Sequence, residues 1–130
     1  MKISKKSQYG LRSLVCLAMT DKEFLSLREI SEKEKISFDY LGKIFSKFEK
    51  SGIVKSKKGS QGGYSLALPS NKIKVGEVLR VLEGDISLVE CVGNKKCTFK
   101  KSCKTINAWR KIQESLEKTI NSISLKDLIN

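Results

Sequence analysis

Residues 26–52 read SLREISEKEKISFDYLGKIFSKFEKSG, and this stretch decides the fold. Ser26, with Glu29 three residues later, forms a capping box, which marks the start of a helix. Ser37 can cap a second helix, in which apolar residues recur at helical spacing and which ends at Gly52. Two short helices joined by a connection of about four residues form a helix-turn-helix pattern. The pattern alone is weak evidence for DNA binding, because many helical proteins contain such a pair.

The next stretch, IVKSKKGSQGGYSLALP at residues 53–69, predicts a β-hairpin. Apolar residues alternate on both sides of a turn that is rich in glycine. A basic hairpin directly after a recognition-type helix is a wing, in which Lys55, Lys57 and Lys58 would face phosphates. The alternative is an ordinary solvated hairpin. Because the helix pair, the hairpin and the net charge of +12 agree, the sequence favours DNA binding.

Length and composition narrow the remaining classes of function. A chain of 130 residues with 39% hydrophobic residues predicts one compact domain with a real core. The sequence has no histidine and no paired acids in a recognisable site, so we expect no enzyme. No segment approaches the length of a transmembrane helix, and Arg12 interrupts the apolar part of the N-terminal stretch. We therefore expect a cytoplasmic protein with no membrane partner.

Three more helices are expected outside the central stretch. The first covers residues 8–19 and contains Cys16, which we interpret as a small buried hydrophobe. Another covers residues 75–82 and ends at Gly84. The last is long, and residues 123–129 then form a short closing element that packs back.

The long C-terminal helix predicts a homodimer. Its apolar residues recur every three or four positions and cover more surface than a small winged-helix body can bury, so a partner helix from a second subunit is the natural solution. The alternative is that the helix folds back onto its own core. The stripe consists of Ile106, Trp109, Ile112, Leu116 and Ile120.

Cys91, Cys97 and Cys103 are separated from one another by five residues, in a segment rich in lysine. This spacing differs from that of zinc fingers and ribbons, which are built from closer pairs, and disulfides are rare in the cytosol. Iron or an iron–sulfur cluster is the better interpretation, because lysines lower thiol pKa values and offset the charge of a thiolate-bound cluster. Two alternatives remain, a solvated basic loop with incidental cysteines and a reversible thiol switch without metal.

The order of these features resembles the Rrf-type winged-helix transcription regulators of bacteria (IscR/NsrR/CymR-like). The resemblance rests on the helix-turn-helix, the wing KKGSQGGY, the helix VGEVLRVLEG, the three cysteines and the AW that follows them. It runs from MKISKKSQYGLRSL to ISLKDLI, almost the whole chain. It implies a homodimer that crosses its long helices and binds palindromic promoter DNA. It also implies an iron–sulfur cluster, 2Fe-2S or 4Fe-4S, held by Cys91, Cys97 and Cys103.

The sequence departs from this family in the fourth cluster ligand. Members use a histidine or an aspartate, and the matching positions here hold Ile106 and Gln8. The candidates are therefore the partner subunit's first helix near Gln8, Asn107, or an exogenous thiol or water, whereas Cys16 is a poor one. The resemblance does not determine the cluster type or the signal that is sensed, because some family members sense cluster supply, others sense nitric oxide, and others work without a cluster. A glutamate that aids site discrimination in some members is replaced by Gly42.

The residues expected to contact DNA lie at the start of the second helix of the pair and at the tip of the wing. Lys43 would donate to guanine, and Asp39 would accept from cytosine or merely cap its helix. Lys47 is better placed for a phosphate, and Lys58 would enter the minor groove or hold the backbone. Lysines near the N-terminus, including Lys6, would add nonspecific phosphate contacts. The full set is Ser37, Asp39, Tyr40, Lys43, Lys47, Lys58, Gly59, Ser60, Gln61 and Gly62.

The predicted fold class is mainly α with a small β-hairpin wing, a winged helix-turn-helix with a long C-terminal dimerisation helix. Residues 1–84 form the DNA-binding domain, residues 85–104 the cysteine-rich cluster loop, and residues 105–130 the dimerisation helix and closing element. The predicted function is a transcription regulator that senses iron–sulfur status, nitric oxide or redox. The alternatives are a cluster-free repressor controlled by a partner protein or thiol oxidation, and a basic RNA- or ribosome-associated protein with a zinc-stabilised loop.

Overall fold

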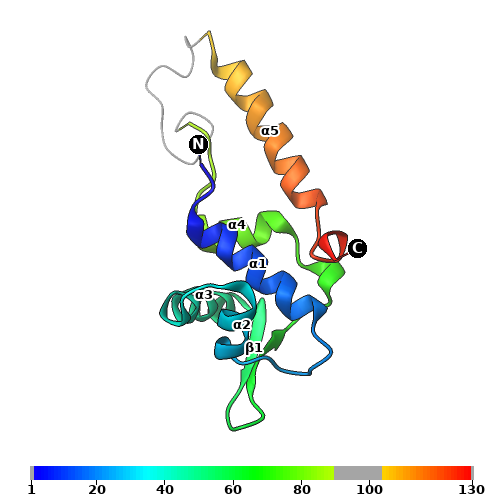
Figure 1. The fold of residues 1–130 in the computed structure, drawn as a ribbon. Helices are drawn as coiled ribbons and strands as arrows, with labels where there is room; N and C mark the ends of the chain where they lie inside the picture. Colours follow the sequence, from blue (N-terminus) through cyan, green and yellow to red (C-terminus); the bar gives the residue numbers. More distant parts are fainter. Residues whose placement is uncertain (1, 90–103, 130) are drawn as a thin grey trace.

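The computed structural model describes residues 2–89 and 104–129, and Figure 1 shows their arrangement. Most of the chain is helical, and the strands form one antiparallel hairpin, which confirms the predicted fold class. The elements are α1 (Lys5–Met19), α2 (Leu27–Glu34), α3 (Phe38–Ser51), β1 (Val54–Lys57), β2 (Gly63–Leu66), η1 (Ser70–Lys72), α4 (Val75–Glu83), α5 (Ile106–Ser122) and η3 (Lys126–Leu128).

Local sequence signals start and stop the central helix pair as expected. The Ser26 hydroxyl accepts from the N–H of Glu29 at 3.1 Å, and the Glu29 carboxylate accepts from the N–H of Ser26 at 3.2 Å. This reciprocal capping box satisfies donors at the start of α2 that no helical carbonyl can reach. The Ser37 hydroxyl alone caps α3 by accepting from the Tyr40 N–H, and α3 ends at Gly52 with a left-handed backbone (φ 82°).

The core lies where α1, α3 and α4 meet under the hairpin. Phe45 and Phe48 of α3 are fully buried, with ring centroids 5.5 Å apart in an edge-on arrangement. Burying a phenylalanine side chain stabilises a fold by about 1.5–3 kcal/mol, so these rings anchor the inner face of α3. Gly10 lets α1 approach closely, because an added Cβ would lie 2.4 Å from Leu82 Cδ1 of α4.

The hairpin is joined to the body by backbone hydrogen bonds. Val54 pairs with Leu66, and the Tyr64 N–H donates to the Leu25 carbonyl at 2.7 Å while the Leu25 N–H donates back at 2.9 Å. Gly63 is required here, since its φ is 142° and a Cβ would lie 2.3 Å from the Leu25 carbonyl oxygen. The return strand ends at Leu66, two residues before the alternation of the sequence suggests.

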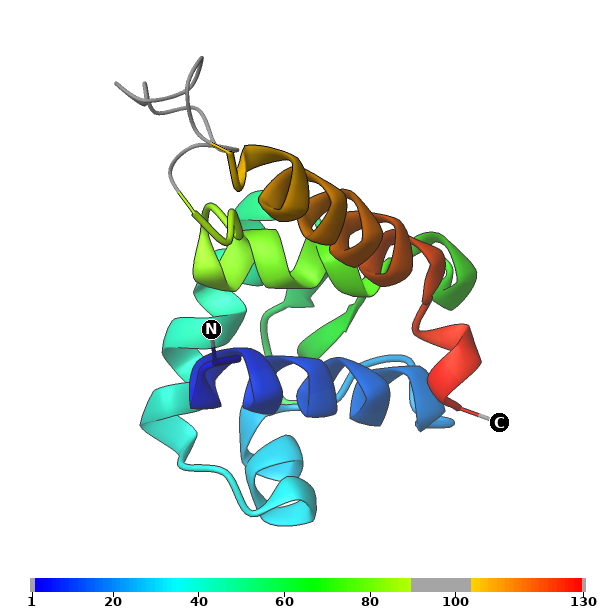
Figure 2. The same cartoon turned by 90° about the horizontal axis from the view of Figure 1, so that it is seen from above.

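The C-terminal elements pack back onto the body, as the sequence predicts. α5 runs beside α4, and its N-terminal end reaches beyond the other helices (Figures 1 and 2). The Val75 N–H donates to the Ile123 carbonyl at 2.8 Å, and the Leu125 N–H donates to the Ile73 carbonyl at 3.0 Å. Leu125 is fully buried, so the closing element is part of the core.

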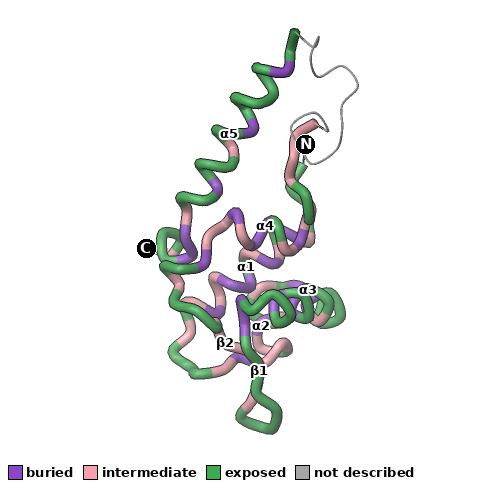
Figure 3. Tube along the Cα trace, turned by 180° about the vertical axis from the view of Figure 1, so that it is seen from behind, coloured by how far each residue is buried: buried purple, intermediate pink, exposed green. Residues whose placement is uncertain are grey.

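The apolar stripe of α5 is divided between two environments. Ile106 and Ile120 are buried within the subunit, each with 8% of its surface exposed. Trp109 and Ile112 remain 37% and 47% exposed, and the tube in Figure 3 is largely green along this helix. The two ends of the stripe thus pack on the chain itself, as in the alternative in which the helix folds back, and the homodimer stays a prediction for the exposed middle. No helix in the part of the chain that the structure describes is long and apolar enough to cross a membrane.

Candidate nucleic-acid interface

The outer face of α3 is polar and basic. Helical spacing turns Leu41, Ile44, Phe45 and Phe48 inward and leaves the other side exposed. Lys43 and Lys47 are four positions apart in the sequence, so they lie one turn apart on this exposed side. The full exposed set along α3 is Phe38, Asp39, Tyr40, Lys43, Ser46, Lys47, Glu49, Lys50 and Ser51.

The first turn of α3 shows which polar residue caps the helix. The Ser37 hydroxyl accepts from the N–H of Tyr40 at 3.4 Å. The cap is therefore Ser37 and not Asp39, so the capping alternative for Asp39 is wrong. Asp39 is exposed in the first turn, where a carboxylate interacts favourably with the positive end of the helix. Tyr40 is 36% exposed, and its ring packs edge-on against Tyr9 of α1 at 5.6 Å.

The wing tip carries the remaining predicted residues. Lys58 to Gln61 are exposed, and Gly62 closes the turn by donating its N–H to the Gly59 carbonyl at 3.0 Å. Gly59 has a φ of 107°, a backbone conformation that suits a tight turn. Ser60, Gln61 and Gly62 also border a polar hollow next to Phe24 and Lys22. The structure thus groups these residues at one end of the molecule, where the hairpin projects from the body (Figures 1 and 3).

Two contacts fix the wing relative to the body of the protein. The Ser56 hydroxyl donates to the Glu49 carboxylate at 2.5 Å, which joins β1 to the end of the helix. The Lys57 ammonium lies 5.6 Å from the centre of the Phe24 ring, a cation–π contact that turns this side chain toward the body. Lys58, one residue further, is therefore the better wing cation for a phosphate than Lys57.

A second helix contributes charge beside α3. Lys6 of α1 lies near Lys47, and its ammonium group lowers the pKa of Lys47. The N-terminal lysines predicted as nonspecific phosphate contacts therefore include one that joins the surface of α3.

Sequence reasoning left out Phe38 and Lys50 at the two ends of the exposed face of α3, and Arg28 on α2. Phe38 is 50% exposed at the start of the helix, and Arg28 is exposed on the helix that precedes it. Helical spacing was the signal that could have found Lys50, since it lies seven residues after Lys43.

The three predicted metal ligands, Cys91, Cys97 and Cys103, lie outside the described residues. The chain that leads into this segment is held by α5, because the Leu88 N–H donates to Gln113 Oε1 at 2.8 Å. Gln113 is 5% exposed, and its amide group donates to the Glu117 carboxylate at 3.1 Å. A buried amide with both ends hydrogen-bonded fixes the position of Leu88 against α5.

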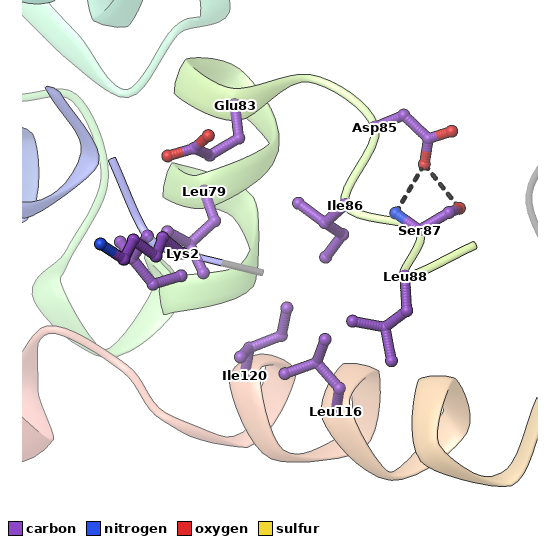
Figure 4. A pocket seen from close by; sticks show the side chains of 10 residues that line it. Lys2, Leu79, Glu83, Asp85, Ile86, Ser87, Leu88, Leu116 and Ile120 are labelled. Carbon is purple, nitrogen blue, oxygen red and sulfur yellow. Dashed lines mark hydrogen bonds between the residues drawn. The ribbon is translucent and has the colours of Figure 1, made fainter. Parts of the chain in front are cut away.

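An apolar cavity of about 420 Å³ lies between the N-terminus, α4, residues 85–88 and α5. Figure 4 shows Leu79, Ile86, Leu88, Leu116 and Ile120 converging on it. The Asp85 carboxylate accepts from the Ser87 hydroxyl at 2.7 Å and forms a turn at the edge of the cavity. Leu116 of the α5 stripe is therefore partly covered by its own subunit.

Cys16 is the cysteine that the structure describes, and it is partly buried on α1. Burial raises the pKa of its thiol, and the nearby Glu34 carboxylate raises it further. A protonated thiol is a weak metal ligand, which agrees with the interpretation of Cys16 as a packing residue. Among the described residues, no three or more Cys, Asp or Glu side chains are grouped so that they could hold a metal ion.

A helix-turn-helix whose second helix exposes a basic face, followed by a basic hairpin, defines a winged-helix DNA-binding protein. Within this class the chain belongs to the Rrf2 family, since residues 3–130 match the family model described as "Iron-dependent Transcriptional regulator". The HTH-type transcriptional regulator IscR of Pectobacterium atrosepticum is 31% identical over 131 positions, which cover all of this chain and 80% of that protein.

Two solved structures have the same fold over nearly the whole chain. CymR (YrzC), the global cysteine regulator of B. subtilis, is 33% identical with a TM-score of 0.82, and the match covers 99% of this chain and 96% of that one. T. potens IscR is 35% identical with a TM-score of 0.79, and the match covers 99% and 86%. The protein is therefore a transcription regulator and not an enzyme.

Proposed function

We propose that this regulator is a homodimer that binds palindromic promoter DNA through α3 and the wing, and that a cluster held by Cys91, Cys97 and Cys103 controls its binding. The observation that carries the DNA-binding part is the exposed basic face of α3 beside the projecting wing. A helix fits the major groove, and a hairpin beside it reaches the adjacent backbone or minor groove.

The proposed contacts divide by position. Ser37, Asp39, Tyr40 and Lys43 lie on the first two turns of α3, the part of a recognition helix that meets base edges. Lys47 lies one turn further along the exposed face and suits a phosphate. The wing residues Lys58, Gly59, Ser60, Gln61 and Gly62 form a tip that follows the backbone or enters the minor groove.

The homodimer rests on the open middle of α5. Trp109 and Ile112 expose apolar surface next to a shallow hollow bordered by Ile112, Ser115 and Leu116. A second copy of α5 would remove this surface from water. A twofold dimer would also present two copies of α3 to half-sites about one helical turn of DNA apart, which accounts for a palindromic operator.

The donor chemistry of the cysteine segment fits an iron–sulfur cluster. Three thiols supply the soft ligands that iron–sulfur clusters prefer, and the five lysines between Cys91 and Thr105 offset the negative charge of bound thiolates. When bound, the cluster would supply a centre that responds to oxidants, nitric oxide or iron supply. The hydrogen bond from the Leu88 N–H to Gln113 would hold the start of this segment against α5. A structural change at the cluster would therefore be transmitted to α4 and α5.

The fourth ligand is proposed to be a neutral or exogenous group. Gln8 is exposed on α1, with its amide donating to the Ile3 carbonyl at 3.0 Å. Asn107 is exposed at the start of α5, and its Oδ1 accepts from Arg110 at 3.4 Å. Amides bind iron less firmly than thiolates or imidazoles, which would leave one iron position accessible to small molecules.

Three successive parts of the chain are proposed to have separate roles. Residues 1–84 bind DNA, residues 85–104 sense, and residues 105–130 dimerise. Contacts between α4 and α5 join the first part to the third, and the hydrogen bond from Leu88 to Gln113 joins the second part to the third, so none is an isolated module.

A second candidate function is a cluster-free repressor that a partner protein or thiol oxidation controls. The similarity to CymR of B. subtilis favours it, since its TM-score of 0.82 is as high as that of an IscR. Iron and acid-labile sulfide in protein purified without oxygen separate the two candidates. A colourless protein without either would favour this second function, and a brown one with both the first.

Replacing Lys43 by alanine is expected to relax sequence choice, whereas replacing Lys58 by alanine weakens binding evenly. A lysine that donates to a guanine edge contributes about 1–3 kcal/mol of discrimination, while a phosphate contact carries no sequence information. Competition between a selected palindrome and its single-base variants measures the difference. Equal losses on all sequences for Lys43→Ala would assign that lysine to the backbone.

A further inference from the structure

Glu83, the last residue of α4, ties the end of α4 to the start of α1. Its Oε1 accepts three hydrogen bonds, from the Ser4 N–H at 3.0 Å, the Ser4 hydroxyl at 2.5 Å and the Ser7 hydroxyl at 2.6 Å. These bonds, first those from Ser4 and Ser7, lower the pKa of Glu83 to about 2, so the carboxylate is ionised near neutral pH. Figure 4 shows its side chain turned toward α1 and away from Asp85.

The residues that Glu83 holds determine the shape of the first turn of α1. The Ser4 hydroxyl caps this helix by accepting from the Ser7 N–H at 3.2 Å, and Ser7 is 1% exposed. The first turn contains Lys5 and Lys6 and no acid, which is unfavourable at the positive end of a helix. The Glu83 carboxylate supplies the missing negative charge from a distant part of the chain.

The same turn presents Lys6 to α3. α1 packs along α3, since the Tyr9 and Tyr40 ring centroids lie 5.6 Å apart and a Cβ on Gly10 would lie 3.0 Å from the Phe48 ring. Lys6 lies one turn before Gly10 and Lys47 directly precedes Phe48, so the two lysines are neighbours across these helices, and the charge of Lys6 lowers the pKa of Lys47. Two cations held together on a surface raise the energy of the free protein and fit an anion between them. A phosphate oxygen would accept from both and relieve the repulsion.

We infer that Glu83 is a positioning residue for DNA binding: by holding the first turn of α1 it places Lys6 beside Lys47, so that both contact one backbone phosphate. This inference rests on the proposed DNA interface, in which Lys47 faces a phosphate. It adds Lys6 as a second lysine at the phosphate that Lys47 contacts. It also attributes the position of Lys6 to Glu83, an acid that itself touches no DNA.

The direction in which Glu83→Ala changes the affinity for DNA distinguishes a positioning role of Glu83 from a simple effect of its negative charge. Removing an acid from a protein normally strengthens its binding to DNA, because the protein becomes more positive. Glu83→Ala is instead expected to weaken binding to duplex DNA by about threefold to tenfold, the range of one lost phosphate contact. The matched control is Glu77→Ala on α4, which removes the same charge without touching Ser4 and should leave binding unchanged or slightly stronger.

A double-mutant cycle with Lys6→Gln tests the proposal on a duplex without the operator sequence, where base contacts do not contribute. Glu83→Ala should weaken binding in the unaltered protein and change it by less than about twofold in the Lys6→Gln background, because coupled residues are not additive. The same loss in both backgrounds, or stronger binding by Glu83→Ala, would overturn the inference. No duplex binding by the unaltered protein would overturn the proposed function and this inference with it.

The salt dependence shows whether the two lysines share a phosphate. If they do, Lys6→Gln or Lys47→Gln alone leaves the slope of log affinity against log salt nearly unchanged, and the double variant reduces it by about 0.9 per subunit. A reduction of that size for each single variant would mean two separate phosphates and contradict the shared contact.

Two further variants exclude a simple loss of folding. Glu83→Gln keeps the acceptor oxygen without the charge, and Ser7→Ala removes one donor and keeps the charge, so both should weaken binding less than Glu83→Ala. Circular dichroism and the thermal midpoint set an assay temperature at which every variant is folded. Glu83→Gln binding as weakly as Glu83→Ala, with both fully folded, would show that charge alone matters and contradict positioning by hydrogen bonds.

Discussion

Cys97→Ala protein, reconstituted without oxygen with iron and sulfide, is expected to hold no cluster. Cys97 is the middle thiol of three, and the chain offers no histidine to replace it. Losing one of three thiolates leaves iron with weaker ligands only, and an incomplete set does not retain a cluster. Iron and acid-labile sulfide counted per subunit, together with the visible absorption spectrum, measure the loss.

Cys16→Ala is the matched control for this experiment. Cys16 lies partly buried on α1, with a thiol pKa raised by burial, so its removal should leave the cluster content unchanged. A full and spectrally unchanged cluster in Cys97→Ala would show that the three-thiol site is wrong. Loss of the cluster in Cys16→Ala would instead identify that thiol as a ligand.

Replacing Ile112 by aspartate is expected to convert the proposed dimer into monomers. Ile112 is 47% exposed in the single chain, so a change there costs little within the subunit. In a twofold interface the new carboxylate would be buried twice without a partner, at a cost of about 3 kcal/mol or more for each copy. Light scattering of the purified protein at micromolar concentration measures the mass.

Leu116 is less suitable for this test than the sequence suggests, because it lines the cavity between α4 and α5 of its own subunit. The matched control is Lys118→Asp, which introduces the same carboxylate at an exposed position about 120° further around α5. It should stay dimeric. An intact Ile112→Asp dimer with the thermal midpoint of the unaltered protein would place the interface elsewhere on the chain.

Local sequence signals were sufficient for the elements that carry the interface. The capping box at Ser26, the cap at Ser37 and the glycine after α3 each depend on residues within four positions. Their hydrogen bonds form inside one helix end, so the sequence specifies them without knowledge of the rest of the fold.

The contacts that connect the parts of the protein were not predictable in this way. Glu83 accepts a hydrogen bond from Ser4, which is 79 positions away in the sequence, and Gln113 accepts one from Leu88, which is 25 positions away. Only the packing of α1, α4 and α5 brings these residues together. The same packing divides the α5 stripe, since residues 85–88 partly cover Leu116 and leave Ile112 exposed. Lys57 likewise turns to Phe24, a contact that strand alternation does not indicate.

The affinity of one preparation for its selected palindrome, with and without reconstituted cluster, tests the central claim most directly. We expect reconstitution to change the affinity of the unaltered protein by about tenfold, within the usual range of coupling between two sites, and to leave Cys97→Ala unchanged. Palindromes selected from random duplex DNA with each form of the protein supply the probes. An equal affinity of the unaltered protein in both states, or the same change in Cys97→Ala, would contradict control by a cluster at these cysteines.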